Sequence, residues 1–150
     1  MNNKFKAIVL NQSGDKFSRE VKNLDTSFFK SGNVLVKVDY SGLNYKDALI
    51  LRNGAKLVKE YPHIPGIDFS GQVKESDSPD FKPGDDVVVT GSKIGELYPG
   101  GYSQLVKVKS ELLVKKPKSI SNKNAMILGT AGFTSLLCAF AIKAREELLL

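Results

Sequence analysis

Asn44-Tyr45-Lys46-Asp47-Ala48-Leu49 and Pro62-His63-Ile64-Pro65-Gly66-Ile67-Asp68-Phe69-Ser70-Gly71 are the two segments that set this chain apart from an ordinary series of strands and turns. The first segment places an asparagine, a tyrosine and an aspartate where a short apolar turn begins. The second surrounds one carboxylate with two prolines and two glycines, which fix or specially shape the backbone. Together the two segments predict a preshaped pocket that contains a phenol.

Around these segments, residues 1–117 are predicted to be rich in β-strands. Apolar and polar side chains alternate between residues 34 and 40, a period of two that is typical of a half-buried strand. Further strands are expected at residues 5–10, 69–75, 86–90, 102–109 and 112–116. Turn signals rich in Gly, Pro, Ser and Asp separate these runs. Short strands at this spacing favour a barrel or a sandwich.

Helices are predicted at only a few places. One short helix is expected at residues 47–52, closed by Asn53-Gly54. After Pro117 the character of the chain changes, and Ser121 can cap a helix that ends at Gly129. A second helix is expected to begin near Gly132 and to carry apolar residues at helical spacing. It shows no stop signal before the last residue, which predicts a chain that has been cut short.

Residues 125–142 are nearly free of charge and are about as long as a minimal transmembrane helix. Glycines, threonines and a serine interrupt this stretch, so two short buried helices fit better and no membrane span is expected. The first ten residues are too short for a signal-peptide core, and a cytoplasmic protein is therefore expected.

Composition excludes several other classes of protein. With 41% hydrophobic and 25% charged residues, the chain has the make-up of a globular protein. A net charge of +6 raises the question of nucleic-acid binding. The lysines, however, are spread along the chain without a basic helix, so no nucleic-acid partner is expected. The single cysteine, Cys138, allows no internal disulfide and no multi-cysteine zinc site, and we expect it to be a small buried hydrophobe.

Tyr45 is the best single candidate for chemistry, because a phenol can donate a proton or a hydrogen bond to developing negative charge. A tyrosine that merely anchors a turn is an equally good interpretation of the local sequence. Asn44 offers both a donor and an acceptor. For Asp47, capping of the following helix is the stronger interpretation.

Other polar residues give weaker support for a chemical role. His63, the only histidine, is expected to lie partly exposed in a loop and has no second histidine or cysteine near it for a metal site. Asp68 alone supports neither a metal site nor a mechanism based on two carboxylates. No Gly-x-Gly-x-x-Gly segment appears. The residues by themselves therefore predict a β-domain with a shaped pocket and no complete catalytic set.

Several blocks in a fixed order resemble the medium-chain dehydrogenase/reductase superfamily. They are Gly42-Leu43-Asn44-Tyr45-Lys46-Asp47-Ala48-Leu49, Ile64-Pro65-Gly66-Ile67-Asp68-Phe69-Ser70-Gly71, Pro83-Gly84-Asp85-Asp86-Val87, Gly100-Gly101-Tyr102-Ser103 and Ala125-Met126-Ile127-Leu128-Gly129-Thr130-Ala131-Gly132-Phe133-Thr134. Within this superfamily the chain is most similar to the acrylyl-CoA reductase group of quinone-oxidoreductase-like proteins.

The resemblance implies a GroES-like, partly open β-barrel catalytic domain at residues 1–120. It also implies that residues 121–150 begin a Rossmann domain, most of which lies outside this chain. The helix from Gly132 would then be the first helix of that domain, and its apolar face would lack a sheet to cover it. The implied activity is NADPH-dependent reduction of an activated C=C bond, such as that of acrylyl-CoA, to give propionyl-CoA. The full-length enzyme is expected to form a homodimer, and the 150 residues alone are expected to be inactive.

The resemblance also implies where the site lies. The tyrosine that matches Tyr45 lies at the nicotinamide and substrate pocket of the zinc-independent branch, and Asn44 and Thr130 match positions that line the same cleft. Zinc-dependent relatives carry a cysteine near Leu43 or Asn44 and a Gly-His-Glu motif at residues 66–68, and both are absent here. We therefore expect no metal. A quinone reductase, an inactive fragment, a stand-alone binding module and a nucleic-acid-binding barrel remain as alternatives.

Overall fold

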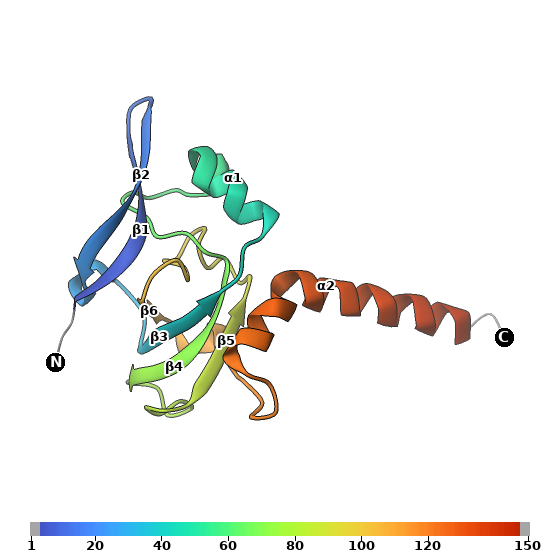
Figure 1. Ribbon diagram of the computed structural model, residues 1–150. Helices are drawn as coiled ribbons and strands as arrows, with labels where there is room; N and C mark the ends of the chain where they lie inside the picture. The colour runs from blue at the N-terminus through green and yellow to red at the C-terminus, as the bar shows by residue number, and fades with distance from the viewer. Residues whose placement is uncertain (1–3, 148–150) are drawn as a thin grey trace.

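The computed structural model describes residues 4–147 and shows a predominantly β architecture with two helices (Figure 1). A two-stranded sheet pairs β1 (Lys4–Ser13) with β2 (Lys16–Asp25). A five-stranded antiparallel sheet has the order β6-β3-β4-β5-β7. Its strands are β3 (Val34–Ser41), β4 (Asp68–Ser76), β5 (Asp86–Thr90), β6 (Leu105–Val108) and β7 (Val114–Lys115). The helices are α1 (Tyr45–Asn53) and α2 (Asn122–Glu147), with short 3-10 turns at Thr26–Phe28, Gly54–Lys56 and Ser110–Leu112.

The two sheets close on each other as a partly open barrel. The outer edge of β1 bonds to the segment before β6, through Ile8 N–H to the Tyr102 carbonyl and Gln104 N–H to the Lys6 carbonyl, each at 2.9 Å. Inward-facing side chains of both sheets form one main core, which includes Phe5, Val36 and Phe69. Removal of this apolar surface from water is the main stabilising contribution to the barrel. The predicted partly open β-barrel is confirmed.

Most predicted strands are present, but their lengths differ. The strands predicted at 102–109 and 112–116 shorten to β6 and β7, because only those residues pair with β3 and β5. No strand was predicted at residues 16–25, where the structure has β2. Its sequence carries three charged residues among its central positions and is mostly exposed, so no period-two apolar pattern marks it. Its pairing comes instead from the tight turn at Ser13–Lys16, which places it along the whole length of β1.

A second, smaller core fixes α1 beside the barrel. Ile50 on α1 packs with Leu10 and Ile67, and the three side chains are buried. Gly54 ends the helix in the left-handed conformation, as the Asn53-Gly54 signal predicts. The helix begins at Tyr45, two residues before the predicted start. The barrel edge and α1 therefore hold residues 44–46 in a defined place.

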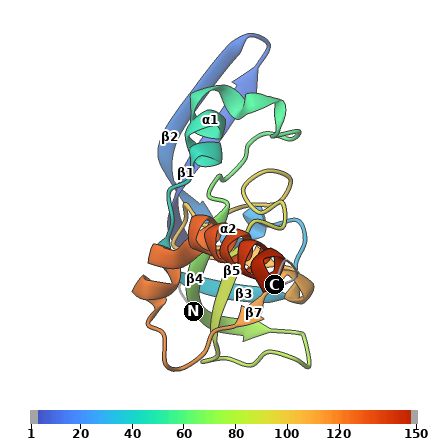
Figure 2. The same cartoon turned by 90° about the vertical axis from the view of Figure 1, so that its right-hand side faces the viewer.

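Helix α2 starts as predicted and then departs from expectation. The Ser121 hydroxyl caps it by accepting from Asn124 N–H at 3.1 Å, and Gly129 breaks it with φ 49° and ψ −157°. Its first part contacts the large sheet, whereas the part after Gly129 projects from the barrel (Figures 1 and 2). The predicted division into two helices at Gly129 is confirmed, but the predicted burial is wrong for the second of them, because Phe133, Leu137 and Phe140 are more than half exposed. Cys138 is also exposed rather than buried.

The same helix bears on the question of a membrane span. Among the described residues, Asn122–Lys143 is the one helix that is long and apolar enough to cross a membrane by length and composition alone. Helices that pack in the interior of soluble proteins pass the same test. The break at Gly129 lies inside this stretch. The absence of a membrane span stays a prediction.

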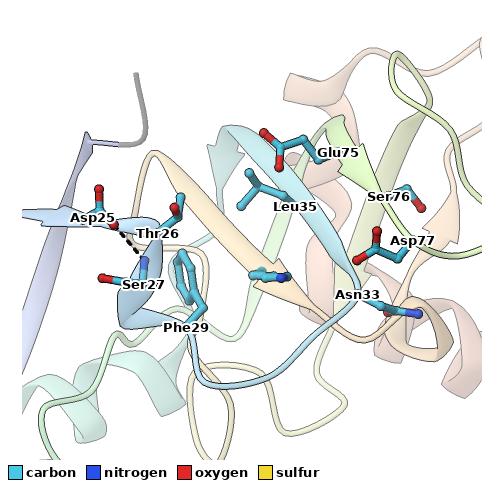
Figure 3. Close-up of a pocket in the computed structure, with 10 residues that line it drawn as sticks. Asp25, Thr26, Ser27, Phe29, Asn33, Leu35, Glu75, Ser76 and Asp77 are labelled. Atoms are coloured by element: carbon cyan, nitrogen blue, oxygen red, sulfur yellow. Dashed lines mark hydrogen bonds between the residues drawn. The ribbon is translucent and has the colours of Figure 1, made fainter. Parts of the chain in front are cut away.

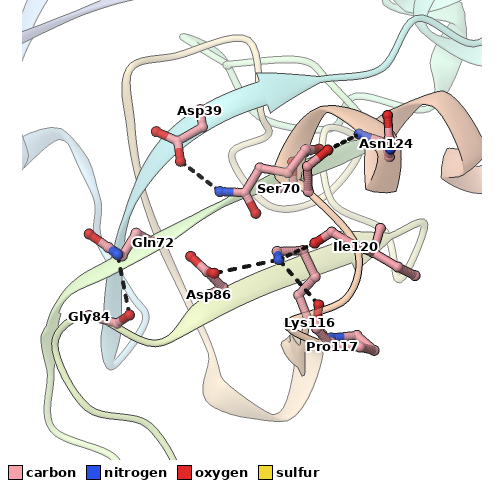
Figure 4. A network of polar contacts seen from close by, with 11 residues as sticks. Asp39, Ser70, Gln72, Gly84, Asp86, Lys116, Pro117, Ile120 and Asn124 are labelled. Atoms are coloured by element: carbon pink, nitrogen blue, oxygen red, sulfur yellow. Dashed lines mark hydrogen bonds and ion pairs between the residues drawn. The ribbon is translucent and has the colours of Figure 1, made fainter.

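A buried lysine holds the segment that connects the barrel to α2 (Figure 4). Lys116 Nζ lies 3.5 Å from Asp86 Oδ2 and donates to the backbone carbonyls of Pro117 and Ile120. Farther along, Ser70 Oγ donates to the Asn122 carbonyl at 2.7 Å, and Asn122 Nδ2 donates to Asp39 Oδ2 at 2.7 Å. These contacts anchor the start of α2 on the large sheet.

His63 is buried, which corrects the expectation of a partly exposed loop histidine. Its exposed fraction is 5%, its backbone pairs with that of Leu10, and its Nε2 lies 2.9 Å from the Gly95 carbonyl oxygen. Burial lowers the pKa of the His63 imidazole below its ordinary value, and the Gly95 contact offsets part of this effect.

A pH dependence of stability follows from this burial. Below the ordinary histidine pKa the unfolded chain takes up a proton that folded His63 resists, so stability is full above that pKa and falls as pH falls toward the folded value. We expect the free energy of unfolding, measured by urea denaturation, to decrease from pH 7.5 to pH 5. His63→Gln should remove much of that decrease. An equal decrease in the variant would contradict the assignment to His63, the only histidine in the chain.

Candidate functional site

An open cleft of about 800 Å³ lies between the start of α1 and the part of α2 after Gly129. All three residues predicted from the sequence to form a site, Asn44, Tyr45 and Thr130, line this cleft. They come from segments more than eighty residues apart in the chain, which the fold brings together. The remaining lining residues are Lys46, Ile67, Gly91, Ala131, Thr134, Ser135, Cys138, Ala139 and Ile142. The lining is mainly apolar, with a few polar groups, as in many small-molecule sites.

Tyr45 lines the cleft and is largely exposed. It is 81% exposed, although it is the first residue of α1. Its hydroxyl makes no hydrogen bond within the described chain, so the tyrosine does not anchor the turn. The phenol is therefore free to contact a molecule in the cleft, although its chemical role stays a prediction.

Asn44 and Asp47 form a reciprocal arrangement at the start of α1. Asp47 Oδ2 accepts from Asn44 N–H at 2.9 Å and from Asn44 Nδ2 at 3.3 Å, which confirms the capping interpretation of Asp47. Asp47 Oδ1 accepts from Ile67 N–H at 2.9 Å. The Asp47 side chain is completely buried, and burial raises the pKa of its carboxyl while these hydrogen bonds counteract the rise.

Asp68 lies directly behind the cleft and contacts both of its walls. Its Oδ1 accepts from Gly42 N–H at 3.0 Å. Its Oδ2 accepts from Asn44 Nδ2 at 3.0 Å and from Thr130 N–H at 3.1 Å. This carboxylate is 1% exposed. The sequence alone did not assign Asp68 a role, because its partners are distant in the chain.

Two buried hydroxyl groups near these carboxylates have no hydrogen-bond partner in the described structure. They are the Tyr102 hydroxyl and Thr130 Oγ1. Burial raises the pKa of the Tyr102 phenol well above its ordinary value, and the negative charges of Asp47 and Asp68 add to the rise. Tyr102 therefore stays protonated. Thr130 Oγ1 is an unsatisfied polar atom in the wall of the cleft, and a bound molecule with a suitable polar group would satisfy it.

An ion pair lies at the mouth of the cleft. Lys46 Nζ is 2.8 Å from Glu96 Oε1, so the loop that carries Glu96 is tied to the start of α1. The Glu96 side chain is mostly buried, while Lys46 stays partly exposed. Lys46 therefore brings a cation, paired with Glu96, to the mainly apolar lining of the cleft.

The donor set does not fit a zinc ion. Among residues 4–147, no group of three or more His, Cys, Asp or Glu side chains is arranged to hold a metal. The carboxylate nearest the cleft, Asp68, is already occupied by three N–H donors. The imidazole of His63 contacts a backbone carbonyl. These side chains would need to give up existing contacts before they could ligate zinc.

A second hollow, of about 640 Å³, lies elsewhere on the barrel and shares no residue with the cleft (Figure 3). Three carboxylates, Asp25, Glu75 and Asp77, line it together with Lys107. Asp25 is engaged in capping the following 3-10 turn through Ser27 N–H at 3.0 Å. The hollow contains none of the residues that the sequence analysis singled out, and we assign it no function.

Comparison with known proteins gives a consistent result. The family model described as "Alcohol dehydrogenase GroES-like domain" matches residues 30–118. Acrylyl-CoA reductase AcuI of Ruegeria pomeroyi is 43% identical over 141 residues, covering 93% of this chain and 43% of that protein. A Bacillus subtilis protein, YhfP, named provisionally as a quinone oxidoreductase, is 42% identical over 137 residues, covering 91% and 42%.

A solved structure agrees with these sequence matches. The YhdH oxidoreductase of Salmonella enterica, in complex with NADP, superimposes with a TM-score of 0.86 at 44% identity. The match covers 93% of this chain and 43% of that one. The chain thus spans less than half the length of the relatives it matches.

Proposed function

Because the chain belongs to the alcohol dehydrogenase GroES-like domain family, within the medium-chain dehydrogenase/reductase superfamily, we propose that it works in an NADPH-dependent reductase. The substrate is an activated C=C bond next to a thioester carbonyl, with acrylyl-CoA reduced to propionyl-CoA. Residues 1–120 supply the catalytic barrel, and residues 121–150 begin the cofactor-binding domain. The proposal rests chiefly on one observation, the meeting of Asn44, Tyr45 and Thr130 in one cleft.

The cleft suits a planar cofactor ring and a small substrate. Apolar groups such as Ile67 and Ala131 provide a surface for the ring, and the unsatisfied Thr130 Oγ1 offers it a hydrogen bond. Asn44 and Thr130 are the proposed contacts to the nicotinamide. NADPH, when bound, would supply a hydride to the β-carbon of the substrate, and the resulting enolate would take a proton at its α-carbon from water in the open cleft.

Tyr45 is the proposed catalytic residue. Reduction at the β-carbon moves negative charge onto the thioester oxygen of the substrate. A hydrogen bond from the Tyr45 hydroxyl to that oxygen stabilises the charge as it develops, and such donors commonly contribute tenfold or more to the rate. The exposed position of the phenol, in the lining of the cleft and without an internal partner, leaves it available for this contact.

Catalysis without zinc is part of the proposal. A zinc ion in related chemistry polarises the substrate oxygen as a Lewis acid. The side chains around this cleft do not fit a zinc site. A hydrogen-bond donor is the remaining means that this chain offers for the same electrostatic task.

Quinone reduction is the second candidate, favoured by the similarity to YhfP. Both reactions need the same cofactor cleft and differ in the acceptor. We further propose a soluble cytoplasmic enzyme that binds neither membranes nor nucleic acid and forms a homodimer at full length. The contrasting possibility is that residues 1–150 are an inactive fragment or a stand-alone binding module, which would not support oxidation of NADPH.

A hybrid enzyme tests the function. Residues 1–150 of this chain replace the corresponding part of the Ruegeria pomeroyi relative, which supplies the other half of the cleft. We expect saturable oxidation of NADPH, followed at 340 nm, that requires acrylyl-CoA and exceeds the rate with a benzoquinone. The unmodified relative is the control. A folded hybrid that binds NADPH but does not oxidise it with acrylyl-CoA would contradict the proposal, and preference for the quinone would favour the second candidate.

A further inference from the structure

Asp68 occupies an unusual place, because a single buried carboxylate bonds to two segments that lie far apart in the chain. It projects from the first residue of β4, where Ser41 Oγ donates to its backbone carbonyl at 2.9 Å. Its Oδ1 bonds to the segment that leads into α1, through Gly42 N–H. Its Oδ2 bonds to Asn44 in one wall of the cleft and to Thr130 in the other. No other group described in the structure bonds to both walls.

The contact with Thr130 acts as a helix cap supplied from outside the helix. Gly129 interrupts α2, so the helix begins afresh at Thr130 and its first N–H groups lack partners within the helix. A carboxylate satisfies such a group and also interacts favourably with the positive end of the helix dipole. The Asp68 carboxylate takes this place, although it lies 62 residues earlier in the chain.

Glycine at position 129 allows the Asp68 carboxylate to lie close to the backbone of α2. A Cβ atom there would lie 2.9 Å from Asp68 Oδ2, closer than ordinary packing allows. The backbone at Gly129 also has φ 49°, which side chains disfavour. The helix therefore breaks at the residue whose missing side chain leaves room for the carboxylate. The hydrogen bond from Thr130 N–H to Asp68 fixes where the projecting part of α2 starts.

We propose that Asp68 is a positioning residue, whose carboxylate holds the two walls of the cleft at one fixed separation. Asn44, on one wall, and Thr130, on the other, are both tied to Asp68 Oδ2, so neither moves relative to the other without breaking a charge-assisted hydrogen bond. The claim that this fixed separation aids hydride transfer rests on the proposed function. The claim that Asp68 fixes the separation of the two walls does not depend on that function.

The test measures the distance between α2 and the barrel in residues 1–150. Cys138, the only cysteine, is exposed on α2 after the break, and a second label site is made by Lys82→Cys in an exposed turn. Nitroxide labels at both sites report the distance distribution by double electron–electron resonance. We expect one narrow distribution for the parent protein and at least a twofold broader one for Asp68→Asn. The amide keeps one accepting oxygen but loses the negative charge, and its NH2 group cannot accept from the N–H donors that face the other position. The matched control is Asp15→Asn, which changes an exposed carboxylate more than fifty residues away from Asp68 in the chain. This variant should leave the width of the distance distribution unchanged.

A second variant removes the other partner of the same bond. Thr130→Pro deletes the N–H that donates to Asp68, together with the threonine hydroxyl, and proline is well tolerated at the start of a helix. We expect the same broadening, and this variant decides the outcome if Asp68→Asn does not fold. A lowered melting temperature with an unchanged narrow distribution in folded protein would overturn the proposal, because it would mean that Asp68 only adds stability. The measurement needs neither cofactor nor turnover, so its failure is distinct from failure of the proposed function.

Discussion

Replacement of Tyr45 by phenylalanine in the hybrid enzyme is expected to lower the turnover of acrylyl-CoA by more than tenfold. The substitution removes one hydroxyl group and keeps the ring that lines the cleft. If the hydroxyl donates to the thioester oxygen as charge develops, its loss raises the activation barrier by about 1.4 kcal/mol or more. The steady-state rate of NADPH oxidation gives kcat directly. The effect should fall mainly on kcat, because the bond strengthens in the transition state.

Tyr40→Phe is the matched control for this prediction. Tyr40 lies on β3, is also exposed, and does not line the cleft, so the same chemical change should leave kcat within about twofold. Protein folding is compared by circular dichroism for both variants. An unchanged kcat for Tyr45→Phe would remove the catalytic role of the phenol and leave only a packing role for its ring.

Replacement of Gly66 by alanine is expected to destabilise the barrel severely. Gly66 has φ +105°, and a Cβ atom there would lie 2.6 Å from the backbone nitrogen of Tyr102 and 2.8 Å from that of Gly101. Both nitrogens are held in place by hydrogen bonds, because Tyr102 N–H donates to the Pro65 carbonyl and Gly101 N–H donates to the Gly66 carbonyl. Backbone strain and overpacking each cost roughly 1–3 kcal/mol. A loss of about 3 kcal/mol or more is expected in the free energy of unfolding, a large part of the stability of a typical domain.

Gly84→Ala separates strain from crowding. Gly84 has φ +94°, close to that of Gly66, but a Cβ atom there meets nothing within 4 Å. Only the strain remains, so a smaller loss of about 1 kcal/mol is expected. Urea denaturation of both variants gives the comparison. Equal losses would show that backbone conformation, rather than close packing against residues 101–102, sets the requirement for glycine at position 66.

The parts of the fold that follow local rules were predictable from the sequence. β3 shows alternation, β5 contains a run of three valines of which Val87 and Val89 are buried, and Gly54 and Ser121 mark helix ends that the structure confirms. β2 was missed because its exposed, charged sequence carries no apolar period, and only its pairing with β1 makes it a strand. For α2 after Gly129, the apolar residues at helical spacing predicted burial without indicating what covers them, and only the resemblance predicted an apolar face without a sheet against it.

The candidate site was predictable only in part, and mostly through resemblance. Asn44, Tyr45 and Thr130 were selected by matching motifs, and their meeting in one cleft is a result of the fold. Asp68 and His63 were misjudged or left without a role, because both depend on partners far away in the chain. Asp68 binds an N–H group 62 residues later, and His63 contacts a carbonyl 32 residues later. Local sequence contains no signal for such contacts.

The most direct test of the central claim follows the hydride itself. The hybrid enzyme is supplied with acrylyl-CoA and with NADPH that carries deuterium at the transferable position of C4, and the thioester product is analysed by mass spectrometry and NMR. Hydride transfer to the β-carbon in this cleft predicts propionyl-CoA with one deuterium at C3. Propionyl-CoA without that deuterium, or oxidation of NADPH without propionyl-CoA, would contradict the account.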